Sequence, residues 1–296
     1  MVRFTTWLRA NADGFVALLV AITVGILAVF EVLNTANVNA AILLVLALLA
    51  VTLLKDRQDS KTLTDTSAVR QLSSVEISQE HAEARRHTEQ WTFKGGTGTF
   101  LRAVTLKECV EHARREQRPL RMQLEILDPT DAALCTMYAR FRSSLTPGPD
   151  GTGEPWTVDR TRKESFATVL AVCWYRQHFA FLRIEVGLSQ VMTTFRWDLS
   201  SHSLIMTQHD QSTTALMFAK GKPYYRAYSR ELDASFQQAR RVDLDQAATL
   251  QLSNEPTIDE TRSLFTMLGL ELPPSFTDRD VSDIIAKALR AKNPYR

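Results

Sequence analysis

The sequence predicts an α/β protein of 296 residues in four parts: a transmembrane helical hairpin (1–55), a helical stalk (56–90), an α/β cytoplasmic domain (91–250) and a small C-terminal helical appendage (251–296). Three observations predict this organisation. Almost all uninterrupted hydrophobicity lies before Lys55. After Trp91, strand-like and helix-like patterns alternate, as in an α/β sheet. From Ile258 onward, two helical patterns are separated by a glycine and two prolines.

The hairpin rests on two apolar segments. Residues 14–33 contain one charge, Glu31, and residues 38–54 contain none. Each segment lies within the range of about 17–25 residues that lets a helix cross a bilayer. Because the linking residues NTANVN are few and polar, we expect the two helices to form a hairpin.

The charges around the two segments predict their orientation. The basic residues lie outside the hairpin, at Arg3, Arg9, Lys55, Arg57 and Lys61, and the turn has none. Since lysine and arginine favour the cytoplasmic side, both termini are expected in the cytoplasm of a multi-pass inner-membrane protein.

Two alternatives concern these segments. Val38-Asn39-Ala40 has the small residues of a signal-peptide cleavage site, but cleavage there would leave a second apolar helix that still needs a membrane. Glu31 fits either a side chain that reaches the interface or part of an ion path.

Residues 56–90 are mixed in charge and contain neither Gly nor Pro, so we expect a helix that continues out of the membrane. Such a stalk could pair between subunits, which predicts a homo-oligomer, although its apolar spacing does not sustain heptads.

The α/β domain is predicted from its local patterns. The expected strands are 121–129, 181–188, 193–199, 203–208 and 214–219, and the expected helices are 105–117, 130–144, 164–178 and 220–240. Residues 144–156 carry three prolines and three glycines and predict a mobile loop.

Composition excludes several classes of partner and cofactor. The formal net charge of +2 predicts no nucleic-acid partner. Three cysteines without framework spacing predict no disulfide. Cys109 and His112 share a helix face, but two ligands do not make a metal site, and no cofactor fingerprint is present.

The order of elements between Trp91 and about Leu244 resembles the phospholipase D-like fold, with TTFRWDLSSHSLIM in the place of the catalytic segment. The chemistry of that family needs His-x-Lys, in which the histidine attacks phosphorus and the lysine binds the phosphate. Here the segment contains Arg196-Trp197-Asp198, and none of the six histidines is followed two places later by lysine. The resemblance therefore implies a degenerate domain. The layout of hairpin, stalk and domain is similar to bacterial two-helix membrane proteins, including anti-phage effectors.

The stretch WTFKGGTGTF contains a glycine-rich loop between a strand and a helix. Free N–H groups in such a loop, together with the helix dipole, can bind an anion, although glycines after a strand also permit a plain turn. We expect any ligand to be anionic, such as a nucleotide. The candidate binding residues are Lys94, Gly95, Gly96, Gly98, Arg196, Tyr225 and Arg226.

Other candidates have structural interpretations. Tyr225 can stack on a base or anchor its helix on the sheet. Arg140 and Arg142 fit a solvated helix face. His178, His202 and His209 lack an obvious nucleophile, and Gly-x-Ser-x-Gly is absent.

Two functions follow from these patterns. The first is a membrane-anchored, non-catalytic sensor or effector whose cytoplasmic domain binds an anionic ligand or partner and signals to the hairpin. The alternative is a membrane-tethered phosphodiesterase or phospholipase D-like enzyme with catalytic groups of another kind.

Overall fold

The computed structural model describes residues 69–145, 155–208 and 213–293, and before them only Thr23, Leu46, Ala47, Leu49, Ala50 and Leu53. The chain divides into two compact units, residues 1–67 and 68–296. The predicted hairpin, apart from those single residues, and the first part of the predicted stalk lie outside the described residues. Within the described residues, no helix is both long enough and apolar enough to cross a membrane.

The second unit is built on a mixed sheet. Its strands are β1 (Val69–Leu72), β2 (Gln90–Lys94), β3 (Leu120–Leu127), β4 (Leu182–Ser189), β5 (Phe195–Ser200), β6 (Ser203–Gln208), β7 (Ala215–Ala219) and β8 (Arg240–Val242). Across the sheet the order is β1-β7-β6-β5-β2-β3-β4-β8. Strands β2, β3 and β4 are parallel, and the other neighbouring pairs are antiparallel.

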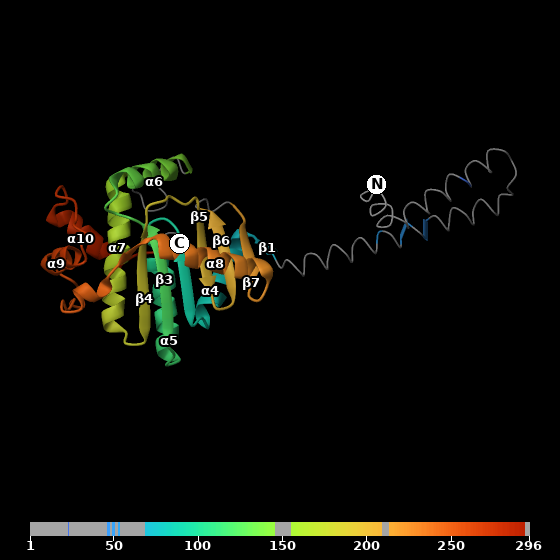
Figure 1. Ribbon diagram of the computed structural model, residues 1–296, viewed down its shortest axis with the longest axis horizontal. Coiled ribbons are helices and arrows are strands. Elements are labelled where there is room, and N and C mark those ends of the chain that lie inside the picture. Colours follow the sequence, from blue (N-terminus) through green and yellow to red (C-terminus); the bar gives the residue numbers. More distant parts are fainter. Residues whose placement is uncertain are drawn as a thin grey trace. The chain divides into compact units, whose positions relative to one another are not determined.

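The helical elements lie between the strands along the chain and after the last strand. They are α4 (Ser74–Arg86), the π-helix η1 (Leu101–Leu106), α5 (Lys107–Arg115), α6 (Ala132–Leu145), α7 (Val158–His178), α8 (Pro223–Gln238), the 3₁₀-helix η2 (Leu244–Ala247), α9 (Ile258–Met267) and α10 (Asp278–Leu289). Helix α6 lies across the end of the sheet at which β3 ends, and α9 and α10 lie beyond α7 (Figure 1). We use the name carboxyl edge for the end of the sheet at which the parallel strands β2, β3 and β4 finish and over which α6 lies.

The largest hydrophobic cluster lies between the parallel strands and helices α5 and α7. It includes Met122, Leu124 and Ile184 from the strands, and it continues to Phe265 of α9 and Ile284 of α10. A separate cluster packs α8 against the opposite face of the sheet. Helices α5 and α7 cover one face of β3 and β4, and α8 contacts Glu125 and Gly187 on the other face, which explains the near-continuous burial of these two strands.

The observed elements confirm the mixed α/β class. Strand β6 has the predicted bounds, and β3, β4, β5, β7, α6 and α8 begin and end within three residues of theirs. Helix α7 begins six residues before the predicted start at Glu164. Its N-cap residue is Thr157, whose side chain accepts a hydrogen bond from the N–H of Arg160.

The described part of the predicted stalk differs from a continuous helix. Val69–Leu72 form the edge strand β1, which pairs with β7, and only Ser74–Arg86 are helical. Leu72 is fully buried, packed with Ile205 and Ala215. The local pattern could not reveal this strand, because its partner β7 lies far along the chain.

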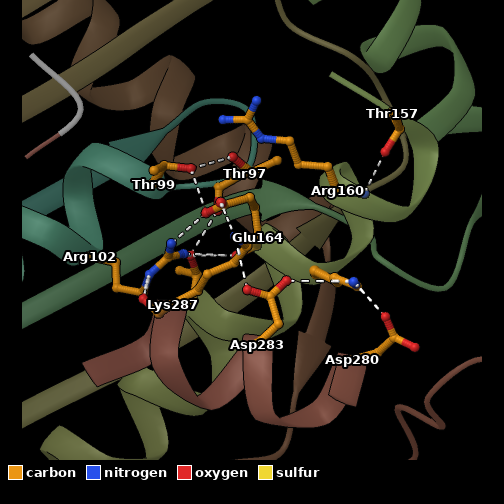
Figure 2. Close-up of polar contacts among 11 residues, drawn as sticks. Thr97, Thr99, Arg102, Thr157, Arg160, Glu164, Asp280, Asp283 and Lys287 are labelled. Atoms are coloured by element: carbon orange, nitrogen blue, oxygen red, sulfur yellow. Dashed lines mark hydrogen bonds and ion pairs between the residues drawn. The ribbon is translucent and has the colours of Figure 1, made fainter. Parts of the chain in front are cut away.

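A buried ion network fixes the C-terminal helices to the sheet domain. Arg102 of η1 donates to a carboxylate oxygen of Glu164 on α7 at 2.5 Å, and Lys287 of α10 lies 3.8 Å from the other oxygen. Asp280 and Asp283 of α10 pair with Lys163 at 2.6 and 3.5 Å. Figure 2 shows Arg102, Glu164, Asp283 and Lys287 meeting between α7 and α10, near Thr97 and Thr99. The two predicted C-terminal helices are therefore part of the same folded unit.

Candidate functional site

The glycine-rich loop, residues 94–98, lies at the carboxyl edge. The N–H of Gly95 donates to the carbonyl oxygen of Glu125, and the N–H of Leu127 donates to that of Gly96, both at 3.1 Å. The loop thus continues the pairing of β2 with β3. The N–H of Arg102 then donates to the carbonyl oxygen of Gly98 at 2.9 Å and begins the helical segment.

Added side chains at Gly96 and Gly98 would meet neighbouring helices. A methyl group on Gly96 would lie 2.2 Å from the hydroxyl oxygen of Tyr138 on α6. Gly98 has a φ of +76°, and a methyl group there would lie 3.0 Å from Thr168 on α7. A side chain on Gly96 therefore requires Tyr138 to move, and one on Gly98 also strains the backbone.

Three consecutive N–H groups of this loop remain available. Among the hydrogen bonds of the described residues, none is donated by the backbone N–H of Gly96, Thr97 or Gly98. All three residues are buried. Buried N–H groups are almost always paired in folded proteins, so three together before a helix are a candidate binding site for an anion or for ordered water.

Two arginines and a tryptophan lie beside Tyr138. The guanidinium carbons of Arg160 on α7 and Arg142 on α6 lie 4.2 and 4.6 Å from the ring centre of Trp156. Tyr138 meets the same indole edge-on, with ring centres 5.8 Å apart. Arg160 reaches from α7 toward Thr97 of the loop (Figure 2). Positive charge is therefore held near the loop from the side of α6 and α7.

Sequence reasoning missed Arg160 and interpreted Arg142 as part of a solvated helix face. Arg142 is instead stacked on Trp156. The sequence signal was weak, because Trp156 follows a loop rich in Pro and Gly and Arg160 precedes the predicted helix. The contact between α6 and α7 brings the three side chains together.

Arg196 approaches the loop from β5. Its Cγ would lie 3.2 Å from a methyl group on Gly95, so the structure brings these two predicted residues together. The Nε of Arg196 donates to Asp198 at 2.9 Å, and the guanidinium lies 5.0 Å from the ring centre of Phe100. Carboxylate and ring together fix the orientation of this cation beside the loop.

Asp198 and its neighbour His81 are almost completely buried, each with an exposed fraction of 2%. Burial, reinforced by the charges of Arg196 and Arg85, lowers the pKa of His81 well below its usual value. Burial also raises the pKa of Asp198, and Arg196 opposes that rise. His81 is therefore neutral at pH 7, 3.9 Å from the Asp198 carboxylate.

Lys94, the first residue of the loop, belongs to a separate polar group on the opposite face of the sheet. Its Nζ lies 3.4 Å from Glu125 and contacts the hydroxyl of Ser235 on α8. Near the end of β3, Arg240 of β8 donates three hydrogen bonds to the carboxylate of Asp128, at 2.7, 2.9 and 3.1 Å. The cations along this edge are thus distributed over both faces.

Tyr225 and Arg226 are not brought to the loop. The hydroxyl of Tyr225 donates to the carbonyl oxygen of Ser200 at 2.8 Å, and Ser200 pairs with Trp91 at the start of β2. Lys94 lies three residues after Trp91 in β2, about 10 Å along the strand. Tyr225 is buried among side chains of α8 and the sheet, as expected of an anchor, and Arg226 is exposed. These two residues thus fall outside the group formed around the loop.

The three cysteines and His81 are buried, whereas His87, His178 and His202 are exposed. All three cysteines are free and buried, and burial raises the pKa of each thiol to about 12. His81 is the described histidine beside Arg196 and Asp198, and its ring is buried. The described residues also contain no cluster of three or more His, Cys, Asp or Glu side chains suited to a metal.

The fold and loop define a mixed α/β domain with a glycine-rich loop at the carboxyl edge of its parallel strands. No protein-family model and no curated protein matches the sequence. Among solved structures, the chain is similar to TrmBL2, an archaeal chromatin protein described with a novel mode of DNA binding. That match has 8% identity and a TM-score of 0.35, over 71% of this chain and 72% of that one.

The chain is also similar to the phosphatidylserine synthase of Haemophilus influenzae. The identity is 10% and the TM-score 0.42, over 75% of this chain and 47% of the synthase. The chain thus spans about half the length of that enzyme. Both TM-scores describe coarse similarities of chain path.

Proposed function

We propose that the protein is a membrane-anchored, non-catalytic sensor or effector whose degenerate phospholipase D-like domain binds an anionic ligand at the carboxyl edge. The observation that carries this proposal is the set of three N–H groups, from Gly96, Thr97 and Gly98, that donate no hydrogen bond among the described residues. Consecutive backbone donors before a helix are suited to phosphate oxygens.

The surrounding charges favour the same class of ligand. Arg196 is oriented by Asp198 and lies against Gly95, and Arg160 is stacked on Trp156, whose ring meets Tyr138. Guanidinium groups bind phosphate and carboxylate through paired N–H donors. A nucleotide or another phosphate-bearing small molecule meets both the charge and the hydrogen-bonding requirements.

The proposed membrane anchor rests on residues 14–33 and 38–54. In support, Leu46, Leu49 and Leu53 are helical, and their side chains have exposed fractions of 56%, 46% and 68%. Exposed leucines on a helix favour an apolar environment such as a bilayer or a partner helix.

Isothermal titration on the full-length protein in lipid nanodiscs tests ligand binding. A panel of nucleotides and cyclic dinucleotides should yield a ligand whose affinity falls about ten-fold to a hundred-fold in Arg196→Gln, the loss expected for a charge-assisted hydrogen bond. The matched control is Arg226→Gln, an exposed arginine on α8 that should leave affinity unchanged. Equal affinity in both variants would place the site elsewhere.

The enzymatic alternative needs a separate assay. The proposal expects only background turnover of generic phosphodiesters and phospholipids, because the histidine beside Arg196 is buried. Turnover that disappears in His81→Gln or His202→Ala would contradict the non-catalytic proposal.

A further inference from the structure

A cavity lies at the opposite end of the sheet from the glycine-rich loop. It has a volume of about 430 Å³ and lies between α5, the last turns of α7 and the first residues of β3 and β4. Leu120 and Leu182, which begin those two strands, form part of its wall. Cavities of this size are typical of small-molecule sites.

Aromatic side chains form much of the wall. Trp174 and His178 are stacked, with ring centres 4.1 Å apart and planes inclined by 18°. Phe179 and Phe181 also line the cavity, and Phe181 has an exposed fraction of 61%. Flat aromatic surfaces bind planar ring systems by stacking and by edge-to-face contact.

The polar groups are few and mostly donors. Arg114 is among the residues that line the cavity, and among the described residues its guanidinium makes no hydrogen bond or ion pair. Asn254 is a lining residue too. The Nδ1 of His178 lies 2.8 Å from the carbonyl oxygen of Trp174, which leaves Nε2 as the other polar ring atom. A cation beside an apolar cavity complements an acid with an apolar body.

We propose that this cavity binds a small aromatic carboxylate, with its ring among Trp174, Phe179 and Phe181 and its carboxylate on Arg114. The site is distinct from the proposed anion site, because the two occupy opposite ends of the parallel strands. Arg114 supplies a planar fork of donors for the two carboxylate oxygens.

The probe is 2-naphthoate, compared with 2-naphthamide, which has the same ring system and no charge. Isothermal titration on the full-length protein in nanodiscs should show naphthoate binding at least ten-fold more tightly than the amide. Arg114→Gln should remove that difference, and Arg114→Glu should weaken naphthoate further.

The neighbouring arginine provides a matched control. Arg115 is exposed and contacts His112 at 3.3 Å, and it is not among the residues that line the cavity, so Arg115→Gln should bind both probes like the parent. Ala113→Phe, which fills the cavity, should abolish binding of both probes. The proposal is overturned if the parent does not bind naphthoate at millimolar concentration. Equal affinity for the two probes, or equal effects of Arg114→Gln and Arg115→Gln, would overturn it as well.

Discussion

Arg102 and Glu164 form a buried ion pair that joins the start of η1 to α7. Arg102 also donates to the backbone oxygen of Glu164 at 2.8 Å and to the hydroxyl of Thr168 at 2.7 Å. Burial raises the pKa of Glu164, but the charge and hydrogen bond of Arg102, together with Lys287 and Thr99, outweigh burial and lower the pKa. Since Thr168 donates in turn to the carbonyl oxygen of Thr97 at 2.8 Å, this pair positions the glycine-rich loop.

Removing the carboxylate charge should therefore destabilise the domain. Glu164→Gln leaves Arg102 buried without its counter-ion, and we expect a loss of about 3 kcal/mol in the free energy of unfolding. Urea titration followed by near-ultraviolet circular dichroism measures this loss. The control Arg262→Gln breaks an exposed pair with Asp278, which lies 2.9 Å away, and should cost under about 1 kcal/mol. Equal losses in the two variants would contradict a structural role for the buried pair.

The packing of Tyr138 on Gly96 predicts a steric effect. Gly96→Ala forces the tyrosine away from the loop, at a cost of about 1–3 kcal/mol. Gly221→Ala is the comparison, because no atom lies within 4 Å of its methyl position and only its φ of +83° opposes alanine. Thermal unfolding of both variants measures the difference. If Gly96→Ala is as stable as the parent, the close contact is not a constraint.

The depressed pKa of His81 predicts a dependence of stability on pH. In the unfolded chain this histidine gains a proton near pH 6.5, whereas in the folded protein it remains neutral to lower pH. The contribution of neutral His81 to the free energy of unfolding is present above about pH 6.5. It is lost as the pH falls, and the loss amounts to about 1.4 kcal/mol at pH 5.5. Asp198, whose pKa is raised by burial, has the opposite effect, because its contribution to the free energy of unfolding increases as the pH falls.

Unfolding free energies at pH 7.0 and 5.5 test this dependence. His81→Gln should show a smaller loss of stability between the two values than the parent. His202→Gln, at an exposed turn, should behave like the parent. A loss in His81→Gln as large as in the parent would show that other groups cause the acid sensitivity.

The proposed topology predicts a protease-protection pattern. In sealed inside-out vesicles, added protease should digest the residues after Lys55, while intact cells should protect them, because the basic residues lie outside the hairpin turn. Immunoblotting against a C-terminal tag reports the outcome. Protection in inside-out vesicles would contradict a cytoplasmic domain.

Several elements could be predicted because their signals are local. Strands β3 and β4 carry buried apolar residues and begin and end near polar or turn-forming residues, and α6 begins three residues after Pro129. Helices α9 and α10 each begin with a threonine that forms a capping box. Hydrogen bonds between residues close in sequence determine such features, so the residue pattern is sufficient to find them.

Other features depend on contacts between distant segments. Strand β1 exists through its pairing with β7, and Trp156 meets Arg142 and Arg160 only where α6 and α7 converge. Tyr225 was grouped with the loop because both lie near strand ends, and only the register of β5 with β2 shows that they face different ends.

The sequence by itself determined the α/β class, the two apolar N-terminal segments and the glycine-rich loop, because periodicity, hydropathy and turn chemistry are properties of neighbouring residues. The tertiary structure alone decided that Arg196 lies against Gly95, that Tyr138 covers Gly96, and that three loop N–H groups donate no hydrogen bond among the described residues. These relationships arise from strand register and helix packing, which join residues far apart in the chain and leave no local pattern.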